Sequence, residues 1–527
     1  MKIRIPQVKL KLDDYQTPLE KIAARALRIK PEDIASVRLS RKSVDARDKS
    51  DVHFSLTLDV ETVRPVRLPK GAQEFADPEP RVFSANRTFE NPPLVVGLGP
   101  AGLFAGLALA RAGVRPLVIE RGKRVEDRER DVSAFWNGGK FDPESNVQFG
   151  EGGAGAFSDG KINSGIKDPR CRQVLEELHK AGAPEEILYQ AKPHIGTDNL
   201  KKVVRHIREE IIALGGDVRF ETCLRELKIE NNRIVGAVLS DKDGRYEVDT
   251  ENVILAVGHS ARDTFEMIYK TGAEMTRKPF SIGARIEHSQ KMVNRSQYGP
   301  AAEHPALGAA DYKLSVHLPN GRSAYTFCMC PGGQVVAAAS EEGGVVVNGM
   351  SYFARDGENA NSALLINVVP EDFGGDDPLA GVRFQQKWER AAFLAGGSDY
   401  RAPAQLVGDF LKKKPSEKAG KVKPSYLPGV KWGSLDACLP DFVAESMRMA
   451  LPLLDRRLKG FASDDAVLTG VETRSSSPVR IERDRNCMAT IEGLYPCGEG
   501  AGYAGGILSA GVDGLRCAEA VMGQDQE

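Results

Sequence analysis

The chain has 527 residues and a formal net charge of −1, with 72 Lys and Arg against 73 Asp and Glu. Its hydrophobic fraction of 41% and charged fraction of 28% are typical of globular proteins and argue against disordered, collagen-like and membrane-embedded chains. The balanced charge gives no whole-molecule argument for binding to nucleic acid or to an anionic membrane. The length predicts about two to four domains.

The cysteines and the first residues of the chain indicate the cellular compartment in which the protein is expected. The eight cysteines are spread widely, and no pair has the spacing of a structural zinc site. The first residues lack the apolar core of a signal peptide, and no run of about 20 apolar residues could span a bilayer. We therefore expect a soluble, reduced, cytoplasmic protein without a metal site.

Residues 1–72 are predicted to form a small α+β domain. Apolar and polar residues alternate over 8–12 and 52–60, and more weakly over 34–39, which predicts strands, while residues 19–26 have helical apolar spacing. This domain has more basic than acidic residues. Solvated faces are the simpler interpretation, and contact with RNA or an acidic partner is the alternative. Residues 73–91, with Pro78 and Pro80, are predicted to be a linker.

The strongest motif lies in residues 94–120. A buried strand leads into Gly97-x-Gly99-x-x-Gly102, a helix follows to residue 112, and a second buried strand ends at Glu120. The first glycine allows a tight turn, the second a close approach to pyrophosphate, and the third close helix–strand contact. The helix N-terminus favours phosphate, and the acid can accept hydrogen bonds from ribose hydroxyls. This order predicts a dinucleotide site.

Two further glycine-rich segments indicate which dinucleotide binds. Residues 150–160 are too rich in glycine to predict a helix or strand, and their free N–H groups could cradle phosphate or the edge of a flavin; a flexible surface loop is the alternative. A strand at 494–497 runs into Gly505 and Gly506, followed by an apolar helix from Ile507. This second helix N-terminus would favour negative charge on a reduced flavin. A two-piece FAD domain needs such a distant element, whereas a nicotinamide enzyme does not.

The remaining patterns complete the predicted architecture. A helix is predicted from Thr197 to Leu214, with strands over 217–227, 233–240 and 252–258. The fold class is therefore α/β and α+β: a discontinuous Rossmann-like FAD-binding domain, an inserted β-rich substrate domain and the small N-terminal domain. The FAD-binding domain comprises residues 92–274 and 465–527, and the inserted domain residues 275–464.

These motifs resemble FAD-dependent oxidoreductases of the glutathione-reductase-like type. More closely, the chain is similar to a bacterial family of uncharacterised FAD-dependent, or NAD(FAD)-utilising, dehydrogenases with an N-terminal α/β domain. The resemblance implies non-covalently bound FAD, with Glu120 at the adenosine ribose and the backbone of Leu224 at adenine. The residues expected to contact FAD are Gly97, Gly99, Pro100, Ala101, Gly102, Glu120, Arg121, Gly153, Gly155, Ser158, Asp159, Leu224, Ala256, Gly258, Gly498, Glu499, Gly505, Gly506 and Ile507.

The implied activity is that of a dehydrogenase that transfers hydride through flavin N5 to or from an unidentified small molecule. The sequence has no second Gly-x-Gly-x-x-Gly after a strand, so we expect no separately folded NAD(P)H domain and only transient binding of NADH or NADPH. Two alternatives remain open. One is a flavin-dependent RNA-modification protein that holds RNA on its N-terminal domain and on the helix face 201–208. The other is a non-catalytic FAD-binding sensor.

Five side chains are weak candidates for catalysis. Cys328 and Cys330 could be a redox pair or a flavin-facing thiol; the alternative is two small buried residues whose side chains lie on opposite faces of a strand. Arg474 could bind an anionic substrate or the flavin edge, or lie in a surface turn. Tyr503 could contact the ring system or simply pack, and His259 could act as a general acid or be structural.

Overall fold

The computed structural model describes residues 1–77 and 81–524. The N-terminal domain is a four-stranded antiparallel sheet covered by helix α1 (Leu19–Leu27). The strands, in the spatial order β2-β3-β1-β4, are β2 (Ile34–Asp45), β3 (His53–Thr62), β1 (Lys2–Lys11) and β4 (Gln73–Glu74). Buried side chains such as Ile22, Phe54 and Leu58 form a core of its own. The predicted helix and strands are confirmed, and β2 runs six residues further than the weak pattern at 34–39 indicated.

The centre of the second domain is a five-stranded parallel sheet of order β23-β11-β5-β6-β7. Its strands are β5 (Leu94–Val96), β6 (Leu117–Ile119), β7 (Asp217–Arg219), β11 (Val253–Leu255) and β23 (Leu494–Pro496). β23 comes from the end of the chain and pairs directly with β11, so the two remote segments form one sheet. The predicted Rossmann-like, discontinuous fold is thus present.

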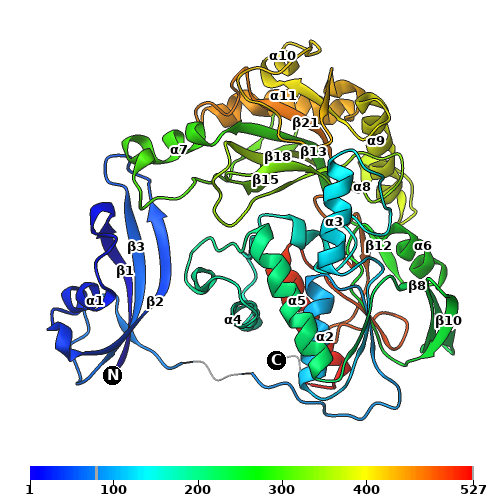
Figure 1. Cartoon of the computed structure of the whole chain (residues 1–527), viewed down its shortest axis with the longest axis horizontal. Helices are drawn as coiled ribbons and strands as arrows, with labels where there is room; N and C mark the ends of the chain where they lie inside the picture. Colours follow the sequence, from blue (N-terminus) through cyan, green and yellow to red (C-terminus); the bar gives the residue numbers. More distant parts are fainter. Residues whose placement is uncertain (78–80, 525–527) are drawn as a thin grey trace.

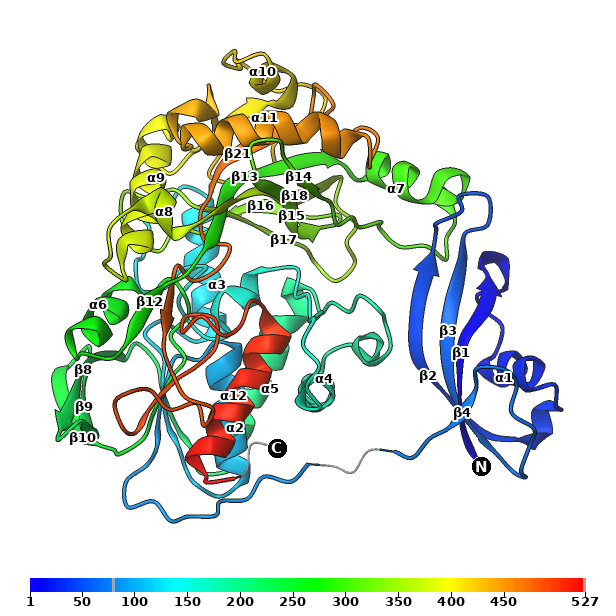
Figure 2. The same cartoon turned by 180° about the vertical axis from the view of Figure 1, so that it is seen from behind.

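Alternate residues of this sheet face two different layers. Val95, Val118 and Ile254 pack with helices α2 (Pro100–Arg111), α5 (Thr197–Ala213) and α12 (Ile507–Val521), which lie together in Figures 1 and 2. Their neighbours along the strands face a three-stranded antiparallel sheet. That sheet consists of β8 (Cys223–Glu230), β9 (Arg233–Asp241) and β10 (Gly244–Asp249). Burial on both faces explains why β5, β6 and β11 are apolar throughout, whereas the edge strand β7 is partly exposed and contains Asp217 and Arg219.

One predicted strand is wrong. Residues 217–227 were expected to form a single strand, but the chain breaks between β7 and β8, where Glu221 adopts a positive φ of 51°. β7 completes the parallel sheet, whereas β8 begins the antiparallel one. Helices α3 (Val125–Trp136), α4 (Arg170–Lys180) and α6 (Arg262–Lys270) complete this domain.

The third domain is built on a seven-stranded, mainly antiparallel sheet of order β14-β15-β18-β13-β21-β19-β20. The strands are β13 (Phe280–Ser289), β14 (Ser315–His317), β15 (Ser323–Cys330), β18 (Asn359–Val368), β19 (Ala402–Leu406), β20 (Val430–Trp432) and β21 (Val467–Glu472). β21 pairs with β13, so this sheet extends beyond residue 464 to Glu472. The chain enters and leaves through the paired strands β12 (Met275–Arg277) and β22 (Val479–Ile481).

Helices cover the outer face of this sheet, so that its inner face lies over the parallel-sheet domain (Figures 1 and 2). The helices and remaining strands of this domain are α7 (Gln290–Tyr298), α8 (Pro370–Phe373), α9 (Ala380–Gly396), α10 (Val407–Leu411), α11 (Asp441–Asp455), β16 (Gln334–Ala337) and β17 (Val347–Met350). The inserted domain is therefore rich in strands but also carries a helical layer.

The N-terminal domain stands to one side of the body in Figure 1. Two backbone hydrogen bonds join them, from Lys42 N–H to the carbonyl of Tyr189 and from Ala191 N–H to that of Lys42. The expected linker begins with Gln73 and Glu74, which pair with β1, while its Pro78 and Pro80 lie outside the described residues.

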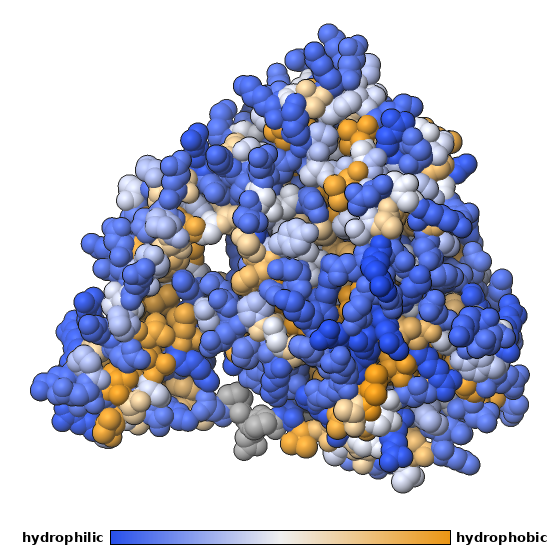
Figure 3. All heavy atoms as spheres, in the orientation of Figure 1, coloured by the Kyte–Doolittle hydropathy of each residue, from blue (hydrophilic) through white to orange (hydrophobic). Residues whose placement is uncertain are grey.

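Figure 3 shows a mostly hydrophilic face, with apolar residues gathered over the N-terminal domain. Within residues 1–77 and 81–524, no helix is both long and apolar enough to cross a membrane.

Candidate cofactor site

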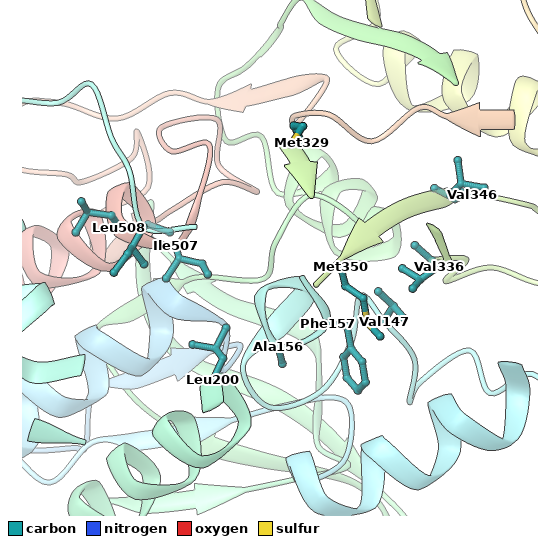
Figure 4. Close-up of a cluster of buried hydrophobic side chains, with 14 of the residues drawn as sticks. Val147, Ala156, Phe157, Leu200, Met329, Val336, Val346, Met350, Ile507 and Leu508 are labelled. Carbon is teal, nitrogen blue, oxygen red and sulfur yellow. The ribbon is translucent and has the colours of Figure 1, made fainter. Parts of the chain in front are cut away.

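A cavity of about 460 Å³ lies where the carboxyl ends of β5, β6 and β11 meet the seven-stranded sheet. Ligands of open α/β sheets bind at this edge, because helices begin there and the strand order reverses. Segments from the front, the middle and the tail of the chain all contribute to its wall. Figure 4 shows the adjoining core, where Ile507 and Leu508 of α12, Leu200 of α5, Ala156 and Met329 lie.

The turn between β5 and α2 has the backbone that the glycine motif predicts. Gly97 has a φ of 99°, and a Cβ there would lie 2.5 Å from the carbonyl oxygen of Ala256. A Cβ on Gly102 would overlap the carbonyl of Gly97, so this glycine permits close helix–strand packing and does not line the cavity. Gly99 does line it, and the nearest atom to a Cβ there would be the Cα of Gly153 at 3.8 Å. Gly99 therefore keeps the N-terminus of α2 open to a ligand.

Glu120 lies at the end of β6 and is almost fully buried. Its carboxylate accepts hydrogen bonds from the backbone N–H groups of Leu98 at 2.8 Å, and of Gly122 and Gly150 at 2.9 Å each. The side chain thus ties the first glycine turn to the second glycine-rich segment. It also lines the cavity, where its oxygens could accept further hydrogen bonds.

Residues 150–160 differ from the expected irregular loop, because Gly153–Phe157 forms a short 3-10 helix preceded by Gly152 with φ 83°. Buried Arg128 of α3 holds the segment before it, donating to the carbonyl oxygens of Asn146 and Glu151 at 2.7 Å each. The predicted residues Gly153, Gly155, Ser158 and Asp159 all line the cavity. A fixed turn, and not a flexible surface loop, therefore faces the site.

The tail supplies a further part of the wall of the same cavity. Gly505, Gly506 and Ile507 line it, and the N-cap of α12, Gly506, has no side chain to satisfy the first N–H groups of the helix. Gly498 lies just outside the wall and donates its N–H to Asp513 at 2.7 Å. Glu499 does line the wall, and burial raises its pKa to about 7.

The other predicted cofactor contacts lie along the same wall. They are Pro100, Ala101, Arg121, Leu224, Ala256 and Gly258. Arg121 is held by Glu144 and Asp263, with its guanidinium 4.3 Å from the centre of the Phe149 ring. A Cβ on Gly258 would meet no atom within 4 Å.

Asp159 is buried between two cations. Its carboxylate contacts Arg355 at 2.5 and 2.9 Å and Lys161 Nζ at 2.6 Å. These charges outweigh the cost of burial and lower the pKa of Asp159 to about 2. The carboxylate is therefore ionised and already partnered, so its contribution to the wall is to hold Lys161 and Arg355 in place.

Arg474 lies in the wall, but its guanidinium is already engaged. Buried Glu389 of α9 accepts hydrogen bonds from it at 2.7 and 2.9 Å and also binds Arg262 of α6 at 2.8 and 2.9 Å. Arg474 also donates to the hydroxyl of Ser260 at 2.9 Å. The arginine is thus buried and is not part of a surface turn, and this ion-pair network joins the two domains at the cavity.

His259 and Tyr503 have different surroundings. His259 lines the cavity, and burial together with Arg474 and Arg262 lowers its pKa to about 3, so the imidazole is neutral near pH 7 and carries no proton to give as an imidazolium acid. The Tyr503 ring lies 3.7 Å from the guanidinium carbon of Arg483 and lines a smaller neighbouring hollow instead.

The two cysteines contradict the expected placement on opposite faces. Positions two apart in a regular strand share a face, and this strand is in addition irregular, since pairing with β18 shifts between Phe327 and Cys330. Cys328 has a φ of 43° and lines the cavity, while Cys330 is fully buried beside it. The Cys330 thiol lies 3.2 Å from the carbonyl oxygen of Cys328.

Sequence reasoning missed several residues that shape this site. Arg128 lies in a strongly charged stretch that predicts only a polar helix, and Lys161, Arg285, Arg355 and Glu389 belong to no motif. Arg285, Arg355 and Glu389 gain their roles from partners far away in the chain, whereas Lys161 pairs with nearby Asp159 and Arg128 binds the carbonyl groups of the segment that follows its own helix. Excess charge at positions that the apolar pattern would bury is the one signal that could have marked them.

The residues present fit a dinucleotide with a flavin at one end. Cβ atoms on Gly258, Gly505 and Gly506 would meet no protein atom within 4 Å, and a Cβ on Gly99 only one at 3.8 Å, so these positions form a cradle of bare backbone. Two helix N-termini without capping side chains, those of α2 and α12, flank it. Such ends bind phosphate and other anionic groups.

Comparisons with known proteins agree with this fit. Residues 279–475 match the family model of the FAD-dependent protein, C-terminal domain-like, and residues 2–61 match a domain of unknown function, DUF8436. An uncharacterized protein of Clostridium beijerinckii is 48% identical over 531 residues, which cover 99% of each chain.

Solved structures resemble the chain more distantly. Flavin-dependent brominase Bmp2 is 12% identical, with a TM-score of 0.38 over 82% of this chain and 79% of its own. The 3-ketosteroid-delta4-(5alpha)-dehydrogenase of Rhodococcus jostii is 13% identical, with a TM-score of 0.35 over 84% and 99%. These scores are too low to support an argument. The match along the whole relative decides the assignment: the chain belongs to the family of its Clostridium beijerinckii relative, and its residues 279–475 match the model of an FAD-dependent C-terminal domain.

Proposed function

We propose that the protein is an FAD-dependent oxidoreductase that transfers electrons between two small molecules. One observation carries this proposal: bare glycine backbone at the start of α2 and at the start of α12 opens onto a single cavity that the seven-stranded sheet covers. A nucleotide-binding cleft alone does not need this cover. A redox site does, because the cover excludes water and provides a surface for a second reactant.

FAD, when bound, supplies the two-electron hydride chemistry at its N5 atom, and the chain supplies position and electrostatics. The N-terminus of α2 with Gly99 would hold the pyrophosphate, and Glu120 would accept hydrogen bonds from the adenosine ribose. The N-terminus of α12 at Gly506 would face the pyrimidine end and favour negative charge there. Leu224 and Arg121 lie in the wall where adenine and its ribose are expected.

The seven-stranded sheet is the proposed substrate side. Thr326, Phe327 and Met329 of β15 line the cavity, and they present a mainly apolar surface. Glu499, with a pKa near 7, lines the same cavity and can take or release a proton close to neutral pH. The Nε2 atom of His259 lies 4.0 Å from its carboxylate. We propose a small, partly apolar substrate and a proton route through Glu499.

NADH or NADPH is the proposed transient electron donor. Within the described part of the chain, the five-stranded sheet is the one sheet built wholly of parallel strands, so no second dinucleotide domain accompanies it. The deciding experiment is anaerobic mixing of the yellow protein with NADH or NADPH. Bleaching of the flavin absorption is expected, and full oxidation after prolonged mixing would favour another donor or the sensor hypothesis.

A paired variant tests the cofactor site itself. Gly99→Val and Gly505→Val together place side chains into the cradle, while neither meets a backbone clash, so folding should persist. We expect a folded, colourless protein that no longer retains added FAD. FAD should leave the unmodified protein on denaturation, as expected for non-covalent binding. Undiminished flavin content in the double variant would overturn the proposal.

The structure gives little support to the RNA hypothesis. Lys9 pairs with Asp51 and Lys201 with Glu129, both at 2.6 Å, and Lys42 is partly buried 4.4 Å from the centre of the Phe54 ring. Many basic residues on these surfaces are thus already occupied. We expect no salt-dependent retention on RNA. Retention that is lost when Lys9, Lys11, Arg41 and Lys42 are neutralised would revive the hypothesis.

A further inference from the structure

The end of β15 carries an irregularity that places a cysteine in the cavity wall. Pairing between β15 and β18 shifts after Phe327 and resumes at Cys330, so that Cys328 and Met329 have no paired partners on β18. Cys328 has a φ of 43°, a left-handed backbone conformation that residues other than glycine rarely adopt. Strained residues of this kind cluster at functional sites. The distortion leaves Cys328 partly open to the cavity and Cys330 buried behind it.

Two buried cations lie against this pair. The Nη2 atom of Arg285 donates to the carbonyl oxygen of Cys328 at 2.9 Å and lies 3.5 Å from the Sγ atom of Cys330. Lys161, which also lines the cavity, interacts electrostatically with both cysteines. Three carboxylates oppose these charges: Asp159, Glu472 and Glu499.

Pairing or burial weakens the repulsion that each of these carboxylates would exert on a negatively charged sulfur. Asp159 is paired with Arg355 and Lys161, while burial raises the pKa of both Glu472 and Glu499 to about 7. The balance around the pair therefore favours a negative sulfur. A hydrogen bond from the Cys330 thiol, with Lys161 and Arg285, lowers the pKa of Cys328 to about 5 in spite of burial. Burial and the neighbouring Cys328 raise the pKa of Cys330.

At the six other cysteines, the pKa of the thiol is raised and not lowered. Cys171 is partly exposed, and Cys223 lines the same cavity, but burial raises the pKa of both thiols. The pKa is also raised at the remaining buried cysteines, which are Cys438, Cys487, Cys497 and Cys517. Of the two cysteines that line the cavity, Cys223 also has cationic neighbours, Arg121 and Arg225, but burial outweighs them, whereas at Cys328 the pKa is lowered, which is the usual property of a reactive thiol.

We propose that Cys328 is a nucleophilic thiolate of the cavity and Cys330 its resolving thiol, so that the pair interconverts between dithiol and disulfide by exchange with a small disulfide. The thiolate attacks one sulfur of R–S–S–R, forms the mixed disulfide Cys328–S–S–R and releases R–S⁻. The Cys330 thiol loses its proton and attacks the sulfur of Cys328, forming the Cys328–Cys330 disulfide and releasing a second R–S⁻. The two cysteines lose two electrons in total, and the small disulfide gains them.

This step goes beyond the proposed oxidoreductase activity and needs no bound flavin. The cavity that holds the pair is nevertheless the proposed FAD site, so the substrate class that it adds is a thiol or disulfide small enough to enter there. Thiol chemistry and flavin retention are measured separately, so that either proposal can fail without the other.

The first test is the pH dependence of alkylation in the full-length, folded protein. Limiting iodoacetamide, followed by peptide mapping with mass spectrometry, is expected to label Cys328 first, with a rate that reaches half its plateau near pH 5. Cys171 should instead react faster with rising pH through the alkaline range. Equal labelling of the two cysteines near neutral pH would overturn the thiolate assignment, and this readout requires no variant.

The second test uses dithiodipyridine as the small disulfide, in a Cys171→Ser background that removes the partly exposed thiol. We expect two thiopyridones to be released for each chain, leaving a disulfide that joins Cys328 and Cys330. In Cys330→Ser, whose hydroxyl can still donate to Cys328, one thiopyridone should be released and one should stay attached. Cys328→Ser should release none at the same rate, and Cys223→Ser, a matched cavity cysteine, should behave like the parent. A lasting mixed adduct on Cys328 in the parent would overturn the resolving role of Cys330.

Discussion

Asp159 is a buried carboxylate that pairs with two cations at the cavity, of which Lys161 lines the wall and Arg355 lies behind Asp159. It is fully buried and paired with Lys161, two residues further along the same segment, and with Arg355, which reaches it from the inserted domain. The sequence placed this residue in a glycine-rich segment and predicted that it contacts FAD. Its role is electrostatic support of the site, because a buried carboxylate between two cations fixes all three side chains.

The pKa of Asp159 predicts a defined dependence of stability on pH. The value is about 2 in the folded chain against 3.8 for the unperturbed group. Because the folded pKa is the lower one, the ion pairs stabilise the fold above pH 3.8, and this contribution is lost as the pH falls from 3.8 towards 2. One pKa unit corresponds to about 1.4 kcal/mol, so the contribution is about 2 kcal/mol. Urea unfolding of Asp159→Asn and the parent should show this gap near neutral pH and its closure in acid.

Asp45→Asn is the matched control for that measurement. Asp45 also has a pKa lowered to about 2, through hydrogen bonds from Arg47, but the arginine is almost fully exposed. Solvent screens such a pair, so its loss should change the free energy of unfolding much less. An Asp159→Asn gap that stays constant at every pH would contradict the argument.

At the scale of elements, the contact between α2 and α12 sets the width of the cofactor cradle. Figure 2 shows α12 beside α2 and α5. A Cβ on Gly514 of α12 would overlap the carbonyl oxygen of Ala101, and one on Gly511 would lie 2.9 Å from the ring of Phe104. These glycines let the helices pack closely, and so bring the two N-termini to one cavity.

Gly514→Ala should therefore separate the helices. Overpacking costs about 1–3 kcal/mol, which exceeds the gain of about 1 kcal/mol from alanine in a helix. We expect a lower free energy of unfolding together with weaker FAD retention, measured by urea titration and by flavin absorbance after gel filtration. Gly308→Ala, where a Cβ meets nothing within 4 Å, is the control. Unchanged flavin content in Gly514→Ala would show that the spacing of α2 and α12 does not matter.

At the scale of the whole molecule, the cavity couples two domains that have separate sheets. The parallel-sheet domain supplies the cradle, the seven-stranded sheet supplies the cover, and Glu389 joins them through Arg262 and Arg474. A ligand that binds only when both are in place must stabilise both. The N-terminal domain has its own core, and none of residues 1–77, all of which the structure describes, lines the wall of the cavity.

Removal of FAD should therefore lower the thermal stability of the body of the protein. At a free FAD concentration 100 times its Kd, binding adds about 2.7 kcal/mol to the free energy of unfolding. Calorimetry of the stripped protein should show a transition that rises with added FAD. Riboflavin, which lacks the pyrophosphate and adenosine, should shift it far less. Equal shifts by both compounds would contradict the assignment of Gly99 and the α2 N-terminus to the pyrophosphate.

Much of the nucleotide-binding core could be predicted from the sequence. The apolar runs and glycine spacings correctly predicted the positions of six elements: β5, α2, β6, β11, β23 and α12. These elements could be predicted because consecutive residues determine their local backbone conformation. The errors have local causes as well. The positive φ of Glu221 ends a strand that its alternation would continue, and Gly153–Phe157 forms a 3-10 turn that glycine content alone does not predict.

The sequence by itself determined the glycine turns, the two helix starts and the division of the FAD domain around an insertion, because each depends on short-range backbone geometry. Only the tertiary structure decided that Gly99 and Gly505 face one cavity, that Arg474 is bound by Glu389, and that Cys328 lies in the wall near Lys161. Ion pairs and cavity walls join residues hundreds of positions apart. The spacing of apolar and polar residues along the chain does not predict such contacts, because they form only when separate sheets pack together.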